Sequence, residues 1–134
     1  MRLPRRITLD VGQLGPFEFP SGWYAYAGSA RGPGGLAARV CRHCRGSDTH
    51  HWHVDYLRAQ AVPAAVWYAC GTEKRECDWA LVLCQSPGAS LPAPRFGASD
   101  CQCPAHAVHF QMPPDHASFS RSVEGSVAEE LLDA

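Results

Sequence analysis

The sequence Gly22-Trp-Tyr-Ala-Tyr-Ala-Gly-Ser-Ala30 begins with alternating aromatic and small residues, which predicts a strand over Trp23–Ala27. A loop with four glycines follows from Gly28 to Gly35, and Leu36–Arg45 favours a helix that ends at Gly46. Because strand side chains repeat every two residues, Tyr24 and Tyr26 are expected on one face of this strand. The segment therefore predicts a strand, a glycine-rich loop and a helix in succession.

This arrangement permits two interpretations. A glycine-rich loop before a helix lets the backbone approach a phosphate group, and the helix amino terminus favours anions. Arg39 and Arg42 can then donate charge-assisted hydrogen bonds to phosphate oxygens. In the alternative, the glycines only relieve backbone crowding and the arginines form a solvated face. The local pattern leaves both interpretations open.

Regular structure is also predicted on both sides of this segment. Short strands are expected at Ile7–Val11, Phe17–Phe19, Val62–Ala69 and Ala107–Phe110. One helix is expected to begin within His51–Leu57, and another spans residues 73–85 with Thr72 as its cap.

Length and composition limit the classes of protein to consider. The chain has 134 residues, of which 46% are hydrophobic and 19% charged, so one folded domain is expected. Neither a membrane-spanning segment nor a secretory signal is apparent, so we expect a cytoplasmic protein without a membrane partner. The net charge is −1, but residues 1–58 carry eight arginines against four acidic residues. That basic half can meet phosphate groups locally.

Glu76 is a candidate metal ligand. On the predicted helix it shares a stripe with Trp79, Ala80 and Leu83, so its carboxylate needs a cation or a hydrogen-bond donor nearby. Metal coordination meets this need, and so does an ion pair with Arg39.

Two further groups of residues can bind metal or transfer protons. His50, His51 and His53 lie close together, although such histidines are commonly structural. Cys101, Cys103 and His106 offer two sulfurs and one nitrogen to a tetrahedral zinc ion. The alternative is that these thiols pack in a turn. A second ligand pair is available in Cys41-Arg-His-Cys44 only if the fold brings it close.

Together these segments resemble the GIY-YIG nuclease superfamily. The resemblance rests on Tyr26-Ala-Gly28-Ser-Ala, on Arg39 with His43 four residues later, and on Glu76. It is closer to a small uncharacterised branch that is sometimes found beside DNA-repair glycosylases. That branch is matched over about residues 7–110, at Val11–Gly15, Gly22–Ala30, Gly35–Leu36, Arg42–His43, His51–Leu57, Glu76–Cys77, Phe96–Cys103 and His106.

The resemblance implies a small α/β domain in which helices flank a three-stranded antiparallel sheet. It also implies metal-dependent hydrolysis of nucleic-acid phosphodiester bonds, with DNA as the expected partner and DNA repair as the setting. Glu76 matches the glutamate that holds Mg²⁺ or Mn²⁺. Arg39 matches the arginine that binds the phosphate, and Tyr26 matches the tyrosine of the YIG half.

The remaining site residues follow from the same comparison. Tyr24 and His43 are expected beside Tyr26 as catalytic residues. Substrate contacts are expected from Gly28, Ser29, Arg42, His51 and His53. No Gly-x-Tyr motif precedes Ile7, so Tyr24, His43 or a histidine of residues 50–53 would take the proton if the first strand is not merely shortened.

These expectations divide the chain into a domain over residues 1–112 and an acidic, flexible tail over residues 113–134. Two alternatives to a nuclease stay open: a nucleic-acid-binding module that has lost hydrolysis, and an interaction domain that zinc stabilises.

Overall fold

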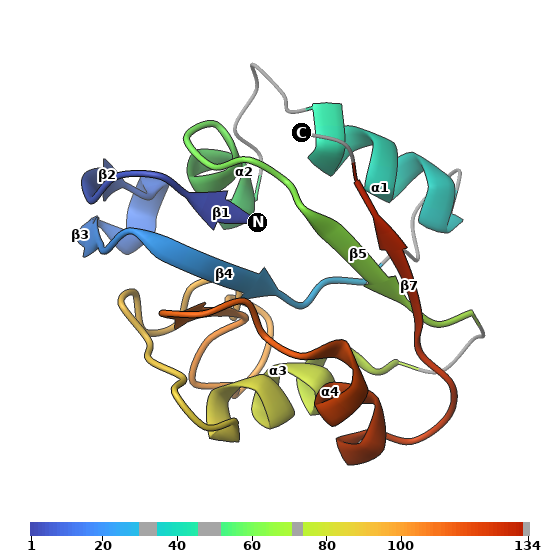
Figure 1. Cartoon of the computed structure of the whole chain (residues 1–134). Helices are drawn as coiled ribbons and strands as arrows, with labels where there is room; N and C mark the ends of the chain where they lie inside the picture. Colours follow the sequence, from blue (N-terminus) through green and yellow to red (C-terminus); the bar gives the residue numbers. More distant parts are fainter. Residues whose placement is uncertain (30–34, 46–51, 71–73, 133–134) are drawn as a thin grey trace.

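The computed structural model describes residues 1–29, 35–45, 52–70 and 74–132. Short strands alternate with helices along the chain (Figure 1). The strands are β1 (Arg2–Leu3), β2 (Ile7–Asp10), β3 (Pro16–Phe19), β4 (Gly22–Tyr26), β5 (Ala65–Tyr68), β6 (Ala107–Phe110) and β7 (Ala128–Leu131). The helices are α1 (Gly35–Arg45), α2 (His53–Arg58), α3 (Glu76–Gln85), α4 (His116–Ser122) and a 3-10 turn at Gly12–Leu14.

A three-stranded antiparallel sheet with the order β1-β4-β6 forms the centre of the molecule. In its longest ladder, Trp23 pairs with Phe110 and Tyr26 pairs with Ala107. Two antiparallel ribbons, β2-β3 and β5-β7, complete the described strands. The mixed α/β class and the three-stranded antiparallel sheet expected from the sequence are therefore confirmed.

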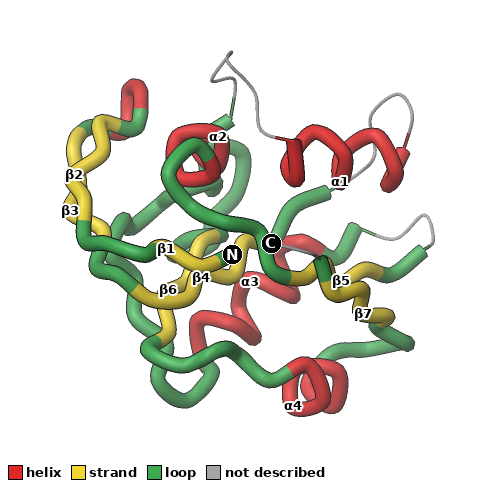
Figure 2. The backbone as a smooth tube through the Cα atoms, turned by 45° about the horizontal axis from the view of Figure 1, so that its top comes forward, coloured by secondary structure: helices red, strands yellow, loops and turns green. Residues whose placement is uncertain are grey.

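Helices lie on both sides of the central sheet (Figures 1 and 2), with α1 and α2 on one side and α3 and α4 on the other. Because strand side chains point alternately to the two faces of the sheet, residues of β4 pack in two hydrophobic cores. Tyr24 packs with Phe19 and Phe96 in the first core. Ala25 packs against the second core, which includes Leu83 and lies beneath α3 and α4.

The elements expected from the sequence are present with small shifts at their ends. The predicted helix over residues 73–85 begins at Glu76, and its expected cap Thr72 lies outside the described residues. Helix α2 begins at His53 because the Asp55 carboxylate accepts the backbone N–H of Trp52 at 2.8 Å, which satisfies a donor that the helix end leaves unpaired. Among the described residues, none of the helices has the length and apolar character needed to cross a membrane.

The segment after Pro113, for which the sequence suggests a flexible tail, contains α4 and β7. Asp115 caps α4 by accepting the backbone N–H of Ser118 at 3.2 Å. β7 pairs with β5 along its whole length, and Phe119 is buried in the second core. This mostly polar segment packs against the rest of the domain because two of its apolar residues, Phe119 and Val127, are buried there.

Candidate metal centre

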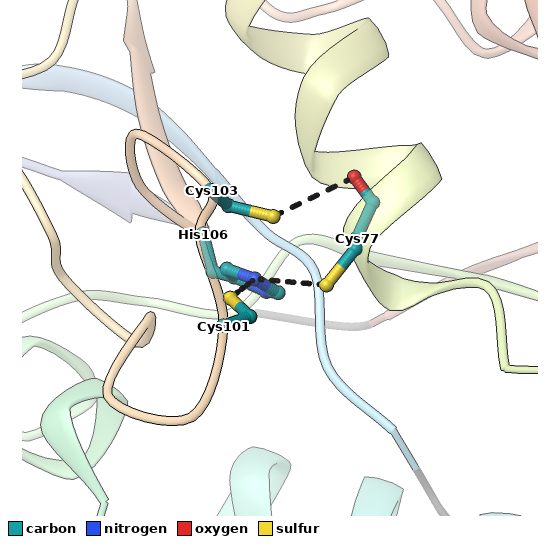
Figure 3. Close-up of side chains that lie close together, drawn as sticks. All are labelled: Cys77, Cys101, Cys103 and His106. Carbon is teal, nitrogen blue, oxygen red and sulfur yellow. Dashed lines mark hydrogen bonds between the residues drawn. The ribbon is translucent and has the colours of Figure 1, made fainter.

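Three thiols and one imidazole converge between α3 and the loop before β6. The ligand atoms of Cys77, Cys101, Cys103 and His106 all lie within 4.8 Å of one another. Figure 3 shows these side chains pointing toward one another, Cys77 from the first turn of α3 and the other three from the loop. The cluster joins two parts of the chain that share no strand pairing.

The ring of His106 is held in the orientation that a metal ligand needs. Its Nδ1 lies 2.9 Å from the carbonyl oxygen of Ala27, so Nδ1 carries the proton and donates it. In the neutral ring, that bond makes Nε2 the acceptor nitrogen, 3.2 Å from the Cys101 sulfur and 3.9 Å from the Cys77 sulfur. A backbone carbonyl that fixes the tautomer in this way commonly accompanies metal-binding histidines.

Arg95 shapes the loop that carries three of the four residues. Its guanidinium donates to the carbonyl oxygens of Ala98, Cys101 and Cys103 at 2.5–2.6 Å. Arg95 itself has a positive φ of 70°, an uncommon conformation for a residue with a side chain. Because one side chain fixes three carbonyls, the loop is organised before any ion binds.

The thiols differ in acidity because their surroundings differ. Burial acts to raise the pKa of Cys101, but a backbone hydrogen bond from Cys103 and a contact with His106 lower it to about 7. Burial and the neighbouring thiols raise the pKa of Cys103 to about 12, and burial also raises that of Cys77. Since a metal binds thiolates, binding at this cluster would release protons.

The donor set fits zinc better than Mg²⁺ or Mn²⁺. Zn²⁺ in structural sites is bound tetrahedrally by cysteine sulfur at about 2.3 Å and histidine nitrogen at about 2.0 Å, so sulfur and nitrogen ligands lie about 3.6 Å apart. The two sulfur–nitrogen distances here, 3.2 and 3.9 Å, bracket that value. Mg²⁺ and Mn²⁺ prefer oxygen ligands, and the cluster offers none.

The sequence indicated Cys101, Cys103 and His106 as possible ligands of one metal ion, but it did not indicate Cys77. Cys77 lies on α3, directly after Glu76. The resemblance at Glu76–Cys77 was the sequence signal that could have identified it as a ligand. Of the alternative pair that the sequence suggested, Cys41 is exposed on α1 and is not in the cluster, and the Cys44 side chain lies outside the described part.

A second group of predicted residues surrounds Tyr26, at the end of β4. Burial raises the pKa of the Tyr26 phenol to about 12. The charge of Arg39 acts to lower this pKa, and the charges of Asp55 and Glu76 act to raise it. Three side chains from three helices therefore lie within electrostatic reach of one phenol.

Two arginines of α1 pack on a single aromatic ring. The guanidinium carbons of Arg39 and Arg42 lie 4.0 and 4.6 Å from the centre of the Trp52 ring. Arg42 also forms an ion pair of 2.7 Å with the buried carboxylate of Asp55. The predicted substrate residue Arg42 thus has a structural partner, and it helps to hold α1 against α2.

Glu76 is the first residue of α3, and its side chain is 14% exposed. Its carboxylate lies 4.0 Å from the ammonium group of Lys74. The predicted apolar stripe is present in part, because Ala80 and Leu83 are buried.

His43 lies between two aromatic rings. Its ring centre is 6.1 Å from that of Tyr26 and 6.0 Å from that of Trp52. Burial lowers the pKa of His43, and the charge of Arg39 lowers it further. Both ring nitrogens are buried and make no hydrogen bond within the described part of the chain. A neutral imidazole is therefore expected at neutral pH.

The other predicted residues have different surroundings. Tyr24 is buried and donates to the carbonyl oxygen of Pro20 at 2.6 Å, so its hydroxyl is engaged in the core. His53 accepts the backbone N–H of Gly97 at 2.8 Å through Nδ1. Gly28 is exposed and Ser29 half-buried just after β4, whereas His51 lies outside the described residues.

Gly97 connects the cluster to the Tyr26 region. A Cβ atom at Gly97 would lie 3.0 Å from the Cβ of His106 and 3.1 Å from the Tyr26 ring. The backbone of Gly97 also has a φ of +72°, which favours glycine. A side chain at this position would therefore crowd both groups.

The fold and the cluster define a class: a small α/β domain with a candidate Cys3His metal centre. The chain matches the family described as Domain of unknown function DUF123 over residues 1–128, and it belongs to that family. No curated protein and no solved structure matches the chain.

Proposed function

We propose first that Cys77, Cys101, Cys103 and His106 bind a structural zinc ion. The observation that carries this proposal is the convergence of four ligand atoms within 4.8 Å, with the His106 tautomer fixed by Ala27. A site with four protein ligands is closed, as structural zinc sites are, and leaves no position for a substrate. Reduced thiols of this kind suit the cytoplasm, where we propose that the protein works.

Metal analysis tests this proposal on protein purified without added zinc. We expect about one zinc per chain, because a structural ion co-purifies with the fold. Cys103→Ser should lose most of the zinc, whereas the matched variant Cys70→Ser should keep it, because Cys70 is exposed and outside the cluster. Equal metal content in the two variants would contradict the proposal.

We propose second that the zinc-stabilised domain cleaves nucleic-acid phosphodiester bonds, as its resemblance to the GIY-YIG superfamily implies. Support comes from the grouping of Arg39, Glu76 and Tyr26. The charges of the Arg39 guanidinium and the Glu76 carboxylate both act on the Tyr26 phenol. A guanidinium binds phosphate, and a carboxylate binds a hard cation, so the grouping contains the two elements that phosphodiester hydrolysis needs.

In this proposal Glu76 would hold Mg²⁺ or Mn²⁺. One carboxylate is a sufficient protein contribution when substrate phosphate and water complete the shell. Asp55 is not free to assist, because it binds Arg42 and caps α2. The metal would polarise the scissile phosphate, and Arg39 would bind its oxygens.

The acidity of Tyr26 and His43 limits their roles. With its pKa raised to about 12, Tyr26 keeps its proton at neutral pH, so it would donate a hydrogen bond to the phosphate. His43, whose pKa is lowered, stays neutral and can accept a proton from the attacking water. The zinc ion would act indirectly, since Cys77 fixes the first turn of α3 next to Glu76.

The cleavage test uses nicked, branched and single-stranded DNA with Mg²⁺ or Mn²⁺. Glu76→Gln should abolish cleavage because it removes the metal's charged ligand. Asp78→Asn is the matched control: Asp78 is exposed in the same helical turn, and its change should leave activity intact. Equal cleavage by Glu76→Gln and the parent chain would indicate a contaminating nuclease and overturn the proposal.

The alternative is a module that binds nucleic acid without hydrolysing it. Salt-sensitive DNA binding that survives Glu76→Gln and disappears with Arg39→Ala, without cleavage in any condition, would favour this alternative.

A further inference from the structure

Trp52, at the start of α2, lies against two of the residues proposed for the nuclease site. The guanidinium carbon of Arg39 lies over the indole, 4.0 Å from the centre of its ring. The ring centre of His43 lies 6.0 Å from that of Trp52, and the two ring planes are tilted by 60°. Arg39 is the proposed phosphate ligand and His43 the proposed proton acceptor, so one aromatic side chain adjoins both functional groups.

The position of Trp52 is set by the first core and by one carboxylate. Its backbone N–H donates to the Asp55 carboxylate at 2.8 Å, which fixes the turn that leads into α2. Val54 and Leu57 of the same helix are buried, and Trp52 itself packs against the first core. Because these contacts order the beginning of the helix, the indole provides a rigid support for the side chains that lie on it.

The two arginines that share this ring differ in what else they bind. Arg42 donates to the Asp55 carboxylate at 2.7 Å, so it belongs to the support. Arg39 forms no hydrogen bond or ion pair with another residue of the described part of the chain. A guanidinium stacked on an aromatic ring uses its flat face, and its N–H donors stay in the plane of the group, where they can bind phosphate oxygens in pairs. Of the two, Arg39 therefore has the donors for a ligand.

The stack also lowers the entropic cost of binding. An arginine side chain has many rotamers, and ordering them when a phosphate binds opposes that binding. A side chain that already rests on a rigid ring has lost this freedom in advance. The charge of Arg39 acts on the Tyr26 phenol, and the ring centre of His43 lies 6.1 Å from that of Tyr26. Trp52 thus keeps both residues beside the end of β4.

We propose that Trp52 is a positioning residue of the nuclease site: its ring holds the Arg39 guanidinium in place for a nucleic-acid phosphate and keeps His43 beside it. This role rests on the proposed nuclease function, because Trp52 acts through Arg39 and does not touch the reacting atoms.

Nuclear magnetic resonance of the purified chain tests the stack itself. An aromatic ring displaces upfield the signals of protons that lie over its face, so the Cδ and Nε protons of Arg39 should be displaced in the parent chain. Trp52→Phe retains an aromatic face and should keep part of this displacement, whereas Trp52→Leu retains only apolar bulk and should lose it. Trp67→Leu is the matched control: Trp67 packs with Phe119 in the second core, and its loss should leave the Arg39 signals unchanged.

Affinity for a nicked DNA duplex, measured at fixed salt without Mg²⁺ or Mn²⁺, tests the effect of the stack on phosphate binding. We expect Trp52→Leu to weaken binding about tenfold, the size of a partly desolvated cation–π contact, and Trp52→Phe to weaken it less. Trp67→Leu should bind as the parent chain does. In an Arg39→Ala background, Trp52→Leu should cause no further loss, because a positioning residue acts only through the group that it positions.

Three results would overturn the proposal. Arg39 signals that are the same in the parent chain and in Trp52→Leu would show that the ring does not hold the guanidinium. Equal weakening of DNA binding by Trp52→Phe and Trp52→Leu would mean that the aromatic face is unimportant. A further loss in the Arg39→Ala background would mean that Trp52 does not act through Arg39.

Two measurements keep the test decisive. If Trp52→Leu does not fold, nuclear Overhauser contacts between the Trp52 ring and the Arg39 side chain in the parent chain decide, and their absence would overturn the proposal. A parent chain that does not cleave DNA overturns the nuclease function. The Arg39 signals are recorded without DNA or added metal, so they decide the role of Trp52 separately.

Discussion

The Cys3His cluster and the Tyr26 region lie side by side and differ in how their residues are held. In the cluster, three thiols and one imidazole converge, Ala27 holds the imidazole, and Arg95 holds the loop. Around Tyr26, charged groups already have protein partners, as Arg42 has in Asp55. The first arrangement is complete when one ion is added, whereas the second would need both a metal and a substrate.

In the functions that we propose, this difference separates stability from chemistry. A closed centre of soft ligands would contribute to folding, while a hard-cation site with one carboxylate would stay accessible to exchange. Gly97 is the point at which the two regions touch, so a disturbance on one side can reach the other. The following predictions test that separation.

Loss of a cluster ligand is expected to have the largest effect on stability. Structural zinc in zinc-finger peptides contributes about 10–16 kcal/mol, comparable with the whole stability of a small domain. Cys103→Ser and His106→Ala should therefore lower the free energy of unfolding by more than about 4 kcal/mol in urea titrations followed by circular dichroism. Chelation by EDTA should do the same. A Cys103→Ser midpoint equal to that of Cys70→Ser would count against a structural ion.

Removal of the Asp55 carboxylate should produce the next largest loss. Asp55→Ala removes the carboxylate that pairs with Arg42 and accepts the Trp52 N–H, which predicts a loss of about 3–5 kcal/mol. Zinc content should stay at one per chain, since Asp55 is outside the cluster. Asp78→Ala, on an exposed residue, should change stability by less than about 0.5 kcal/mol. A small Asp55→Ala effect would show that the ion pair does not organise this region.

Gly97→Ala should disturb both regions at once. The new methyl group would crowd His106 and Tyr26, and the positive φ adds strain, so we expect a loss of about 2–3 kcal/mol. Gly88→Ala is matched to it, with a φ of +82° but nothing within 4 Å of the new atom, and should lose about 1 kcal/mol. Weaker zinc binding in Gly97→Ala alone would confirm the connection, and equal losses in the two variants would refute it.

The smallest expected effect is a change of stability at high pH. The folded pKa of Tyr26, about 12, is above the ordinary value of about 10 for a tyrosine phenol. Between these values the folded state holds the proton that the unfolded state has released, so stability falls as the pH rises from about 10 to 12. Tyr26→Phe should flatten this decline and remove one late phase from the tyrosinate absorbance titration. An unchanged titration would mean that the phenol is not buried as described.

The sequence predicted the local elements well because their signals are local. Alternation in residues 23–27 and the apolar run 107–110 each define a strand without reference to the rest of the chain. The segment after Pro113 differed because its few anchors, such as Phe119, act through distant partners on β5 and α3. Tertiary packing there outweighs a polar local composition.

In the candidate site, too, some residues could be predicted from local sequence and others depend on tertiary packing. Cys101, Cys103 and His106 are neighbours in sequence, so spacing alone identified them as possible ligands. Cys77 joins them only because α3 begins against that loop, a contact that no local pattern contains. The pairing of Arg42 with Asp55 is also a product of helix packing.

X-ray absorption at the zinc edge of the purified chain is the sharpest test of the proposed zinc centre. The Cys3His site predicts one zinc with three sulfur ligands at about 2.3 Å and one nitrogen ligand at about 2.0 Å. Replacement of Cys77 by serine should remove one sulfur from that shell or release the ion. Protein without zinc, or zinc surrounded by oxygen and nitrogen alone, would contradict the account.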